Sequence, residues 1–240
     1  MLLIRSLLFN IWFFGTMIVA MLLMWVLLPF PARLTHNMVR LWSRGVQGGM
    51  RLILGLSHEI RGRENLPPGA VLVAAKHQSI WDTTIFHLIF DEPAFVLKKE
   101  LMSIPLWGWY AKKCGMISVN RAGAAAALKA MVRDVTAKLD QGRPVIIFPE
   151  GTRTAPGDEK PYHPGIAALY TAAPVPVVPV ALNSGLFWGR RSFLKRPGHI
   201  VLEILPPMPG GLDRKVFMTE LKARIEAASA RLLAEGRPAA

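Results

Sequence analysis

The stretch AVLVAAKHQSIWDTT, residues 70–84, joins an apolar run to a cluster of polar side chains. The run AVLVAA contains no polar residue, which predicts a strand buried on both faces. Strands of this kind occur in parallel sheets that carry helices on both sides. The cation, imidazole and carboxylate that follow, Lys76, His77 and Asp82, are then expected at the carboxyl end of the strand. Open α/β sheets bind their ligands at that edge.

Similar short apolar runs recur after residue 60 and alternate with helical patterns. The clearest helix covers residues 122–142, with Gly142 as its C-terminal stop. A last helix is expected from Asp213, its N-cap, to Glu235. Strands that alternate with helices predict an α/β fold, with a largely parallel sheet flanked by helices. The predicted strands cover residues 70–75, 94–97, 115–119, 144–148, 175–182 and 199–205.

An apolar segment precedes this part of the chain, and no charged side chain occurs from Ser6 to Ala32. A helix over that segment would be roughly 40 Å long, and a hydrocarbon core of about 30 Å needs about 20 apolar residues. The sequence Pro-Phe-Pro-Ala-Arg at its end is a poor cleavage site for a signal peptide. We therefore expect a retained, membrane-embedded helix. It either spans the bilayer or bends at Pro29 and Pro31 into one leaflet.

Residues 34–55 form a second candidate helix, and a basic stripe runs along it. On a helical wheel four arginines fall within a narrow arc, while apolar side chains spread over much of the remaining surface. This pattern favours a helix in the membrane interface, with its cations on anionic headgroups. A core helix with a solvated face is the alternative. The arginines are Arg33, Arg40, Arg44 and Arg51.

The domain boundary is expected just after this basic segment. Residues 1–57 are predicted to be N-terminal membrane-anchoring helices, and residues 58–240 a single globular domain. The chain carries 29 Lys and Arg against 16 Asp and Glu, a net charge of +13 at pH 7. Such a balance suits anionic lipid headgroups or phosphorylated ligands. Nucleic acid fits the charge too, but it would give the apolar N-terminus no role, so we expect no nucleic-acid partner. The single cysteine, Cys114, favours a reducing compartment.

His77 and Asp82 have the spacing of a general base and the carboxylate that orients it. A neutral imidazole accepts a proton near neutral pH, and a carboxylate in the first turn of a following helix can fix its tautomer. The chain has no G-x-S-x-G elbow, so Ser79 is not expected to be a nucleophile. The pair is therefore a candidate base rather than a covalent catalyst. A helix cap beside an ordinary loop histidine is the alternative.

Two further strand ends carry groups that bind phosphate. In FPEGTR, residues 148–153, Gly151 permits a close approach to the backbone, and Thr152 and Arg153 can donate hydrogen bonds to a phosphate. In SVNR, residues 118–121, Arg121 offers a second guanidinium. Either arginine alone would be compatible with a surface salt bridge. Together with the histidine they predict a phosphorylated substrate whose hydroxyl group is deprotonated. The chain lacks zinc-ligand spacing and a Walker A motif, so no metal and no nucleotide cofactor is expected.

In combination, these blocks resemble the glycerophospholipid acyltransferase family, in particular the 1-acylglycerol-3-phosphate (lysophosphatidic acid) acyltransferases. HQSIWD is similar to the family's H-x-x-x-x-D block, and SVNR and FPEGTR to its second and third blocks. VPVVPVAL, residues 175–182, is similar to its fourth, proline-containing block. LKKELMSIPLWGW, residues 97–109, is similar to a lysine-glutamate-leucine stretch before a proline and a glycine. The blocks occur in the family's order over roughly residues 60–210.

The resemblance implies transfer of an acyl chain from a thioester to the free hydroxyl of 1-acyl-sn-glycerol-3-phosphate, giving phosphatidic acid without an acyl-enzyme. It implies that His77 is the general base and Asp82 its partner, within a catalytic domain at 58–240. Pro179 would lie near the acyl donor. The residues that it assigns to binding and shaping the acceptor site are Lys98, Arg121, Glu150, Gly151, Thr152 and Arg153.

The resemblance also implies the partners. The donor would be acyl-CoA or acyl carrier protein, both anionic and thus suited to a basic chain. The acceptor would be a membrane lipid. The basic segment after the first helix favours a position on the anionic surface of the inner (cytoplasmic) membrane, with the catalytic domain facing the cytoplasm.

Three departures from the family pattern leave the acceptor open. Lys76 stands where asparagine is common, Asn120 where aspartate is common, and His163 near the place of an expected lysine. An acyltransferase for another lyso-lipid acceptor, such as lyso-ornithine lipid, or for glycerol-3-phosphate therefore stays an alternative. A non-catalytic membrane-binding protein, whose function rests on the anchor and the basic stripe alone, is a second alternative from a different class.

Overall fold

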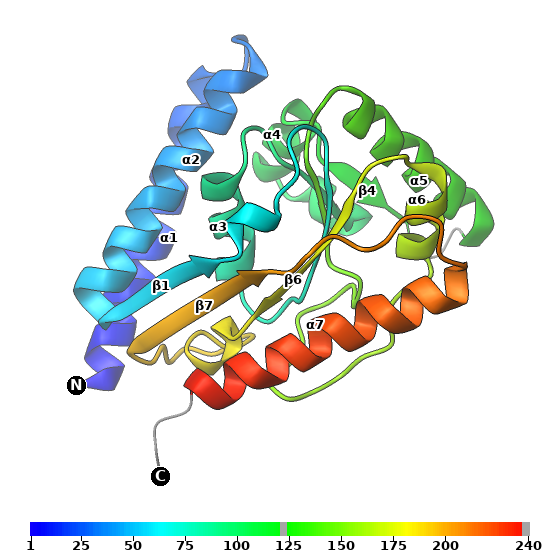
Figure 1. The fold of residues 1–240 in the computed structure, drawn as a ribbon. Coiled ribbons are helices and arrows are strands. Elements are labelled where there is room, and N and C mark those ends of the chain that lie inside the picture. Colours follow the sequence, from blue (N-terminus) through cyan, green and yellow to red (C-terminus); the bar gives the residue numbers. More distant parts are fainter. Residues whose placement is uncertain (121–123, 237–240) are drawn as a thin grey trace.

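The computed structural model describes residues 1–120 and 124–236, and within them a seven-stranded sheet forms the centre of the molecule (Figure 1). The strand order is β1-β7-β6-β2-β5-β3-β4. Neighbouring strands are parallel except for β6 and β7, which are antiparallel. The predicted α/β fold with a largely parallel sheet is confirmed. The strands are β1 (Leu56–Arg61), β2 (Leu72–Ala75), β3 (Ala94–Lys98), β4 (Ile117–Val119), β5 (Val145–Ile147), β6 (Val177–Leu182) and β7 (Gly198–Ile204).

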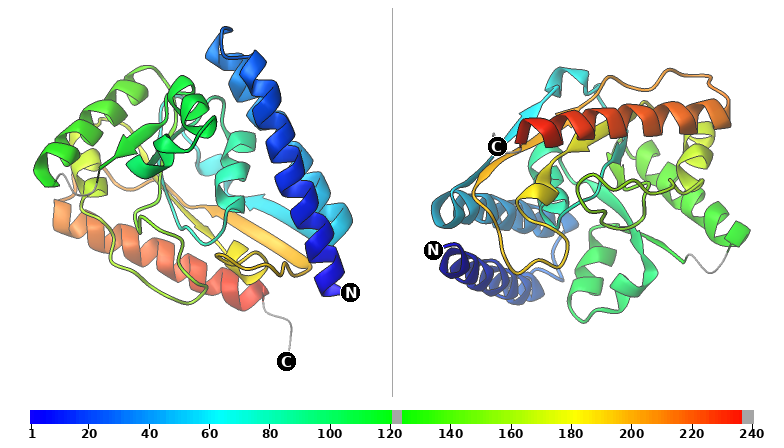
Figure 2. Two further views of the ribbon diagram at one scale, coloured as in Figure 1. Left: turned by 180° about the vertical axis from the view of Figure 1, so that it is seen from behind. Right: turned by 90° about the horizontal axis from the view of Figure 1, so that it is seen from below.

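Helices cover both faces of this sheet (Figures 1 and 2). One core lies between the sheet and the first three helices, and the other between the sheet and the last three. The short helix α4 packs on α2 and on the 3₁₀ turn at 99–103. The helices are α1 (Leu2–Val26), α2 (Ala32–Gly49), α3 (Trp81–Ile89), α4 (Trp107–Lys113), α5 (Ala124–Asp140), α6 (Gly165–Ala172) and α7 (Arg214–Gly236).

Strand β2 is buried on both faces, as its apolar sequence predicts. Leu72 and Ala74 belong to the core that includes α5, α6 and α7, whereas Val73 and Ala75 belong to the core that includes α1 and α3. All four residues have no exposed surface. Because successive side chains of a strand point to opposite faces, a strand covered on both sides has no position for a solvated side chain.

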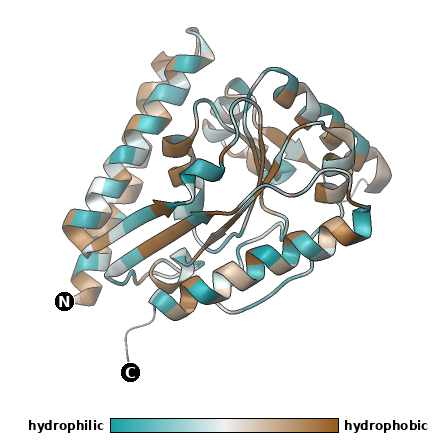
Figure 3. Ribbon diagram, in the orientation of Figure 1, coloured by the Kyte–Doolittle hydropathy of each residue, from teal (hydrophilic) through white to brown (hydrophobic). Residues whose placement is uncertain are grey.

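The two long helices that follow β4, α5 and α7, follow their sequence signals closely. Asp213 caps α7, since its Oδ1 accepts a hydrogen bond of 2.8 Å from the backbone N–H of Lys215. Gly142, with a φ of 75°, follows the last turn of α5 in the left-handed conformation that glycine adopts without strain. Figure 3 shows hydrophobic and hydrophilic residues alternating along α7. Its apolar face is buried and includes Phe217, Leu221, Ile225, Ala228 and Leu232.

Strand β1 was not predicted. It lies at the edge of the sheet and pairs only with β7. Its sequence LSHEIR has a weak two-residue alternation that includes two charged side chains, which an edge strand with a solvated side tolerates. The strand crosses the position between residues 57 and 58 where the sequence places the domain boundary. The division into two domains stays a prediction.

The N-terminal helices form a hairpin along one side of the molecule (Figure 2). The chain turns at 27–31, where two prolines interrupt the apolar segment. A π-helical turn, Met50–Leu54, then extends α2 toward β1. Helix α1 is long and apolar enough to cross a membrane. It leaves most of its large apolar side chains exposed.

The predicted basic stripe on α2 is only partly an open surface. Arg33, Arg44 and Arg51 are exposed, but Arg40 is half-buried against the end of α3. Its Nε donates to the carbonyl of His87 at 3.1 Å, and its Nη2 donates to a second carbonyl near the helix end. Arg40 therefore caps a helix C-terminus, where a cation is stabilising, and three arginines stay available to headgroups.

Candidate active site

His77 and Asp82 meet at the carboxyl end of β2. The His77 Nδ1 atom lies 2.9 Å from Asp82 Oδ2. The same oxygen accepts the backbone N–H groups of Gln78 at 2.7 Å and Ser79 at 2.8 Å. The other oxygen, Oδ1, accepts a hydrogen bond of 2.5 Å from the hydroxyl of Ser184. Asp82 is buried, so these four bonds satisfy its carboxylate and hold it in one orientation.

The contact with Asp82 assigns the tautomer of the imidazole. An ionised carboxylate only accepts hydrogen bonds, so His77 Nδ1 carries the proton. In the neutral ring, Nε2 is then the basic nitrogen. The ring also stacks on Phe148 with a centroid distance of 4.0 Å and an angle of 19°. A histidine fixed by a carboxylate and an aromatic ring is positioned to take a proton from a ligand.

A buried ion network lies behind the His77 backbone. Glu150 Oε2 accepts the N–H of His77 at 3.1 Å, and Glu150 Oε1 lies 2.8 Å from Lys76 Nζ. Lys76 also contacts both carboxylate oxygens of Glu226 on α7, at 2.9 and 2.8 Å, and Tyr162 donates to Glu226 at 3.0 Å. The exposed side-chain fractions are 1% for Lys76, 0% for Glu150 and 12% for Glu226. The network therefore fixes the backbone of His77 through groups that are buried in the protein interior.

Two residues of this network, Glu150 and Lys76, lie outside the cavity in which the acceptor was expected to bind. Glu150 was expected to shape the acceptor site, and it does not line the cavity; its contact with the site is the hydrogen bond to His77. Lys76 also lies outside the cavity lining, so its departure from the family's asparagine does not bear on the acceptor headgroup. His163, another departure from the family pattern, does line the cavity.

Three neighbouring arginines of the described residues line a cavity of about 950 Å³ that His77 also lines. Arg153 is half-buried, and both this burial and the nearby Arg190 guanidinium lower its pKa. Arg190 Nη1 donates to the Arg153 carbonyl at 3.4 Å, and Arg191 completes the group. Sequence analysis missed Arg190 and Arg191, because they follow the fourth block in a stretch without strand or helix periodicity. The paired arginines themselves were the only signal.

The remaining predicted residues occupy different positions. Gly151, with a φ of 64°, and Thr152 line the cavity close to Arg153 in the chain. Lys98 is exposed and also lines the cavity, as does Asn120. Arg121 lies outside the described residues. Pro179 is buried inside β6 opposite Ala74 and does not line the cavity, and its place near the donor stays a prediction.

Most of the remaining cavity lining is apolar, and it reaches the N-terminal hairpin. Its wall includes Phe13 and Met17 of α1, Trp42 of α2 and Trp107 of α4. His87 lines the same region, and burial lowers its pKa to about 3, so the ring is neutral there. A volume at the upper end of the usual range for ligand pockets, with one cationic end, suits a long amphiphile with an anionic head. Among the described residues, no group of three or more His, Cys, Asp or Glu side chains is placed to hold a metal ion.

Comparisons with known proteins show which family the chain belongs to. Residues 57–183 match the family described as Acyltransferase. The 1-acyl-sn-glycerol-3-phosphate acyltransferase of Pseudomonas aeruginosa is 34% identical over 212 residues, which cover 88% of this chain and 82% of that protein. The protein of the same name from Limnanthes alba is 30% identical over 191 residues, which cover 78% of this chain and 66% of that protein.

The fold has a close counterpart among solved structures. The crystal structure of the 1-acyl-sn-glycerophosphate (LPA) acyltransferase from Thermotoga maritima superposes with a TM-score of 0.74 at 24% identity, over 100% of both chains. Sequence and fold lead to the same assignment: the chain belongs to the acyltransferase family, among the 1-acyl-sn-glycerol-3-phosphate acyltransferases.

Proposed function

We propose that this chain transfers an acyl group from acyl-CoA or acyl carrier protein to the free hydroxyl of 1-acyl-sn-glycerol-3-phosphate, giving phosphatidic acid. One observation carries the proposal: the Asp82-bound imidazole of His77 and the guanidinium of Arg153 line one cavity that continues into an apolar region. The acceptor phosphate binds at the arginine end. The apolar region accommodates acyl chain, and the hydroxyl lies at His77.

The reaction then needs one proton shuttle and no covalent intermediate on the protein. The acceptor hydroxyl gives its proton to His77 Nε2 while its oxygen attacks the thioester carbonyl, and Asp82 stabilises the imidazolium. When the tetrahedral intermediate collapses, the C–S bond breaks and the thiolate takes the proton from His77. Products are the new ester and a free thiol, so protons and bonds balance. A positioned general base contributes about 10²- to 10⁴-fold to such a step.

The contacts of α1 support a helix that lies in one leaflet rather than across the bilayer. Near its start, Ser6 Oγ accepts the backbone N–H of Lys195 at 2.9 Å. Near its end, the carbonyl of Met21 accepts the Tyr110 hydroxyl at 2.6 Å. Because both ends are tied to the catalytic domain, a perpendicular helix would carry that domain into the hydrocarbon. We place the exposed side of α1 in the cytoplasmic leaflet of the inner membrane, with the catalytic domain in the cytoplasm.

An acyl-transfer assay with mass-spectrometric detection tests the proposed function. Purified full-length protein is offered lysophosphatidate, lyso-ornithine lipid or glycerol-3-phosphate, each with acyl-CoA and with acyl carrier protein. We expect phosphatidic acid from lysophosphatidate with the highest kcat/KM. A higher kcat/KM for another acceptor would refute the acceptor assignment, and absence of transfer to all three would refute the enzyme.

Asp82→Asn is expected to lower kcat by about 10²- to 10⁴-fold, the full contribution of a positioned base. In the variant, an amide NH₂ would point either at the N–H groups of Gln78 and Ser79, which are donors themselves, or at His77. A donor that faces His77 Nδ1 would favour the tautomer with the proton on Nε2, which cannot act as a base. Ser184→Ala is the matched control, because it removes a hydrogen bond to the same carboxylate and leaves the imidazole contact intact. Steady-state kinetics of both variants should differ clearly; equal losses would show that Asp82 only supports the local structure.

A further inference from the structure

The loop at 189–196, with the sequence GRRSFLKR, combines exposed apolar and cationic side chains. Phe193 is 48% exposed and Leu194 is 41% exposed. Four of its eight residues are cationic and none is acidic. Two large apolar side chains between arginines are the composition of a segment that enters the headgroup region of an anionic membrane. An ordinary solvated loop rarely exposes two such side chains side by side.

This loop is fastened to the helix that enters the membrane. Lys195 is buried, and its Nζ donates to Asn10 Oδ1 of α1 at 2.6 Å. The Asn10 amide donates to the Phe193 carbonyl at 3.1 Å, and Ser6 binds both backbone groups of Lys195. Just before the loop, the ring of Trp188 packs edge to face against the rings of Phe9 and Phe13 of α1, with centroid distances of 5.1 Å in both pairs. The exposed apolar pair thus continues the exposed apolar face of α1.

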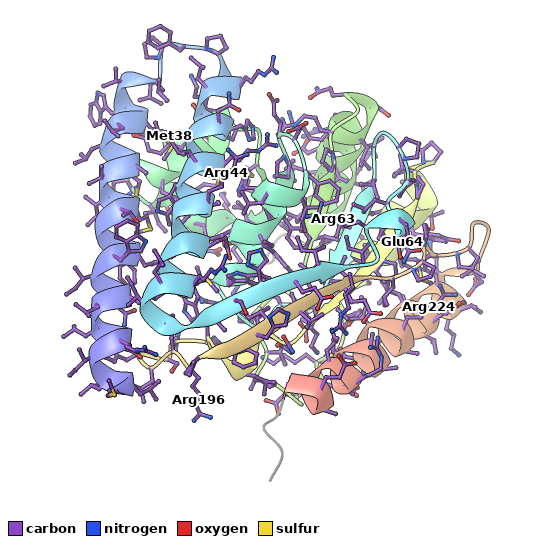
Figure 4. The ribbon with its side chains drawn as sticks, turned by 60° about the vertical axis from the view of Figure 1, so that its left-hand side comes forward. Met38, Arg44, Arg63, Glu64, Arg196 and Arg224 are labelled. Atoms are coloured by element: carbon purple, nitrogen blue, oxygen red, sulfur yellow. The ribbon has the colours of Figure 1, made fainter. Side chains whose placement is uncertain are left out.

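The same loop reaches the acceptor end of the active site. Arg190 and Arg191 line the cavity, and Arg190 binds the carbonyl of Arg153. Arg196, at the other end of the loop, points outward beside the first turns of α1 (Figure 4). Along eight residues the chain therefore runs from the phosphate-binding end of the cavity to the lipid-facing side of α1.

From these contacts we infer that the 189–196 loop is a second membrane-contact element, which inserts Phe193 and Leu194 beside α1 and holds the cavity mouth against an anionic leaflet. The inference rests on the proposed function, because it assigns the loop the task of admitting the anionic acceptor directly from the bilayer. Arg190 and Arg191 then meet the phosphate group at the surface and pass it to Arg153. The lyso-lipid does not need to leave the membrane.

The kinetic test compares one acceptor chemistry in two physical states. Full-length wild type and the Phe193→Ser/Leu194→Ser double variant are assayed with lysophosphatidate embedded in vesicles of phosphatidylcholine and phosphatidylglycerol. They are also assayed with a short-chain lysophosphatidate below its critical micelle concentration. For the double variant we expect a loss of about 10-fold or more in kcat/KM with the embedded acceptor, since two large apolar side chains no longer enter the leaflet. With the monomeric acceptor we expect wild-type rates.

Val216→Ser is the matched control, because Val216 is an exposed apolar residue on α7 outside the loop. It should leave both rates unchanged. Equal rates of the double variant and wild type on vesicles would overturn the inference. A loss with both forms of the acceptor would overturn it as well, since the loop would then act on catalysis and not on lipid access.

A binding measurement keeps this inference separate from the proposed activity. Leu194→Cys is labelled with a polarity-sensitive dye; the native Cys114 is buried and stays unlabelled in the folded protein. Addition of the same vesicles should shift the dye emission to that of an apolar environment. The same label at Lys215→Cys, on α7, should keep its aqueous emission. An aqueous signal at residue 194 would refute membrane insertion of the loop, whereas inactivity of the wild type toward both acceptors would refute the function and leave the dye result standing.

Discussion

His77→Ala is expected to lower kcat by about 10²- to 10⁴-fold, the contribution of a positioned general base. Because His77 Nδ1 donates its proton to Asp82, the other ring nitrogen, Nε2, is free to accept a proton from the acceptor hydroxyl. Water in the space left by the ring would lack both the fixed position and the supporting carboxylate. Single-turnover measurement of phosphatidic acid formation separates this loss in the chemical step from any change in substrate binding.

The control for this variant is His199→Ala. His199 is an exposed histidine on β7 that contacts Ser57 and Glu59 outside the cavity, so the same chemical change should leave kcat unaltered. The His77 variant should still associate with vesicles, because α1 is unchanged. A His77→Ala variant that retains more than about a tenth of the wild-type kcat would show that the imidazole is not the base, because removal of a general base costs about 10²- to 10⁴-fold.

Lys76→Ala is expected to lower the free energy of unfolding by about 3–5 kcal/mol, the effect of removing one partner from a buried ion network. Lys76 is the cation between Glu150 and Glu226, and its loss leaves two carboxylates close together with little solvent. Activity should fall too, because Glu150 holds the backbone of His77. Chemical denaturation in detergent, followed by circular dichroism, measures the stability change.

Lys222→Ala provides the comparison for Lys76. Lys222 also pairs with a glutamate, Glu159 at 2.9 Å, but both side chains are well exposed. Its replacement should change stability by less than about 1 kcal/mol, as for other surface ion pairs. Adding Glu226→Gln to Lys76→Ala should recover about 0.5–3 kcal/mol, because one unpaired charge disappears. A Lys76 effect as small as that of Lys222 would show that the network is not a stabilising part of the site.

The structure brings together the predicted side chains whose positions follow from the strand ends, whereas their roles stay predictions. The run at 70–75 has to be a buried strand, so the side chains just after it have to lie at the sheet edge, and five residues bring Asp82 back to His77. Parallel strands end at a common edge, which also brings Arg153 into the same cavity.

The contacts that sequence analysis could not predict join distant parts of the chain. Ser184 binds Asp82 across 102 residues, and Glu226 binds Lys76 across 150 residues. Nothing local distinguishes Glu226 from Glu220 and Glu235 of α7, because its burial depends on how α7 packs on β6 and β7. From sequence, the lysine at 76 was therefore a departure from the family pattern that left the acceptor open. In the structure it is the counterion of two glutamates.

The position of α1 relative to the bilayer was open for a similar reason. Length and hydropathy are the same for a helix that crosses the bilayer and for one that lies along a leaflet. The one-leaflet position proposed above is supported by contacts at both ends of α1, with Lys195 and Tyr110, whose partners are 189 and 89 residues away in sequence. Those contacts depend on the folded catalytic domain.

The proposed mechanism requires that one cavity holds both the acceptor phosphate and the base that deprotonates the acceptor hydroxyl. The most direct measurement is kcat/KM for lysophosphatidate against monoacylglycerol, which carries the same acyl chain without the phosphate, in wild type and in Arg153→Ala. Loss of a charge-assisted hydrogen bond lowers kcat/KM by about 10- to 100-fold. Wild type should therefore prefer lysophosphatidate over monoacylglycerol by at least that factor. Arg153→Ala should lose most of this preference. Equal kcat/KM for the two acceptors in wild type would contradict the account.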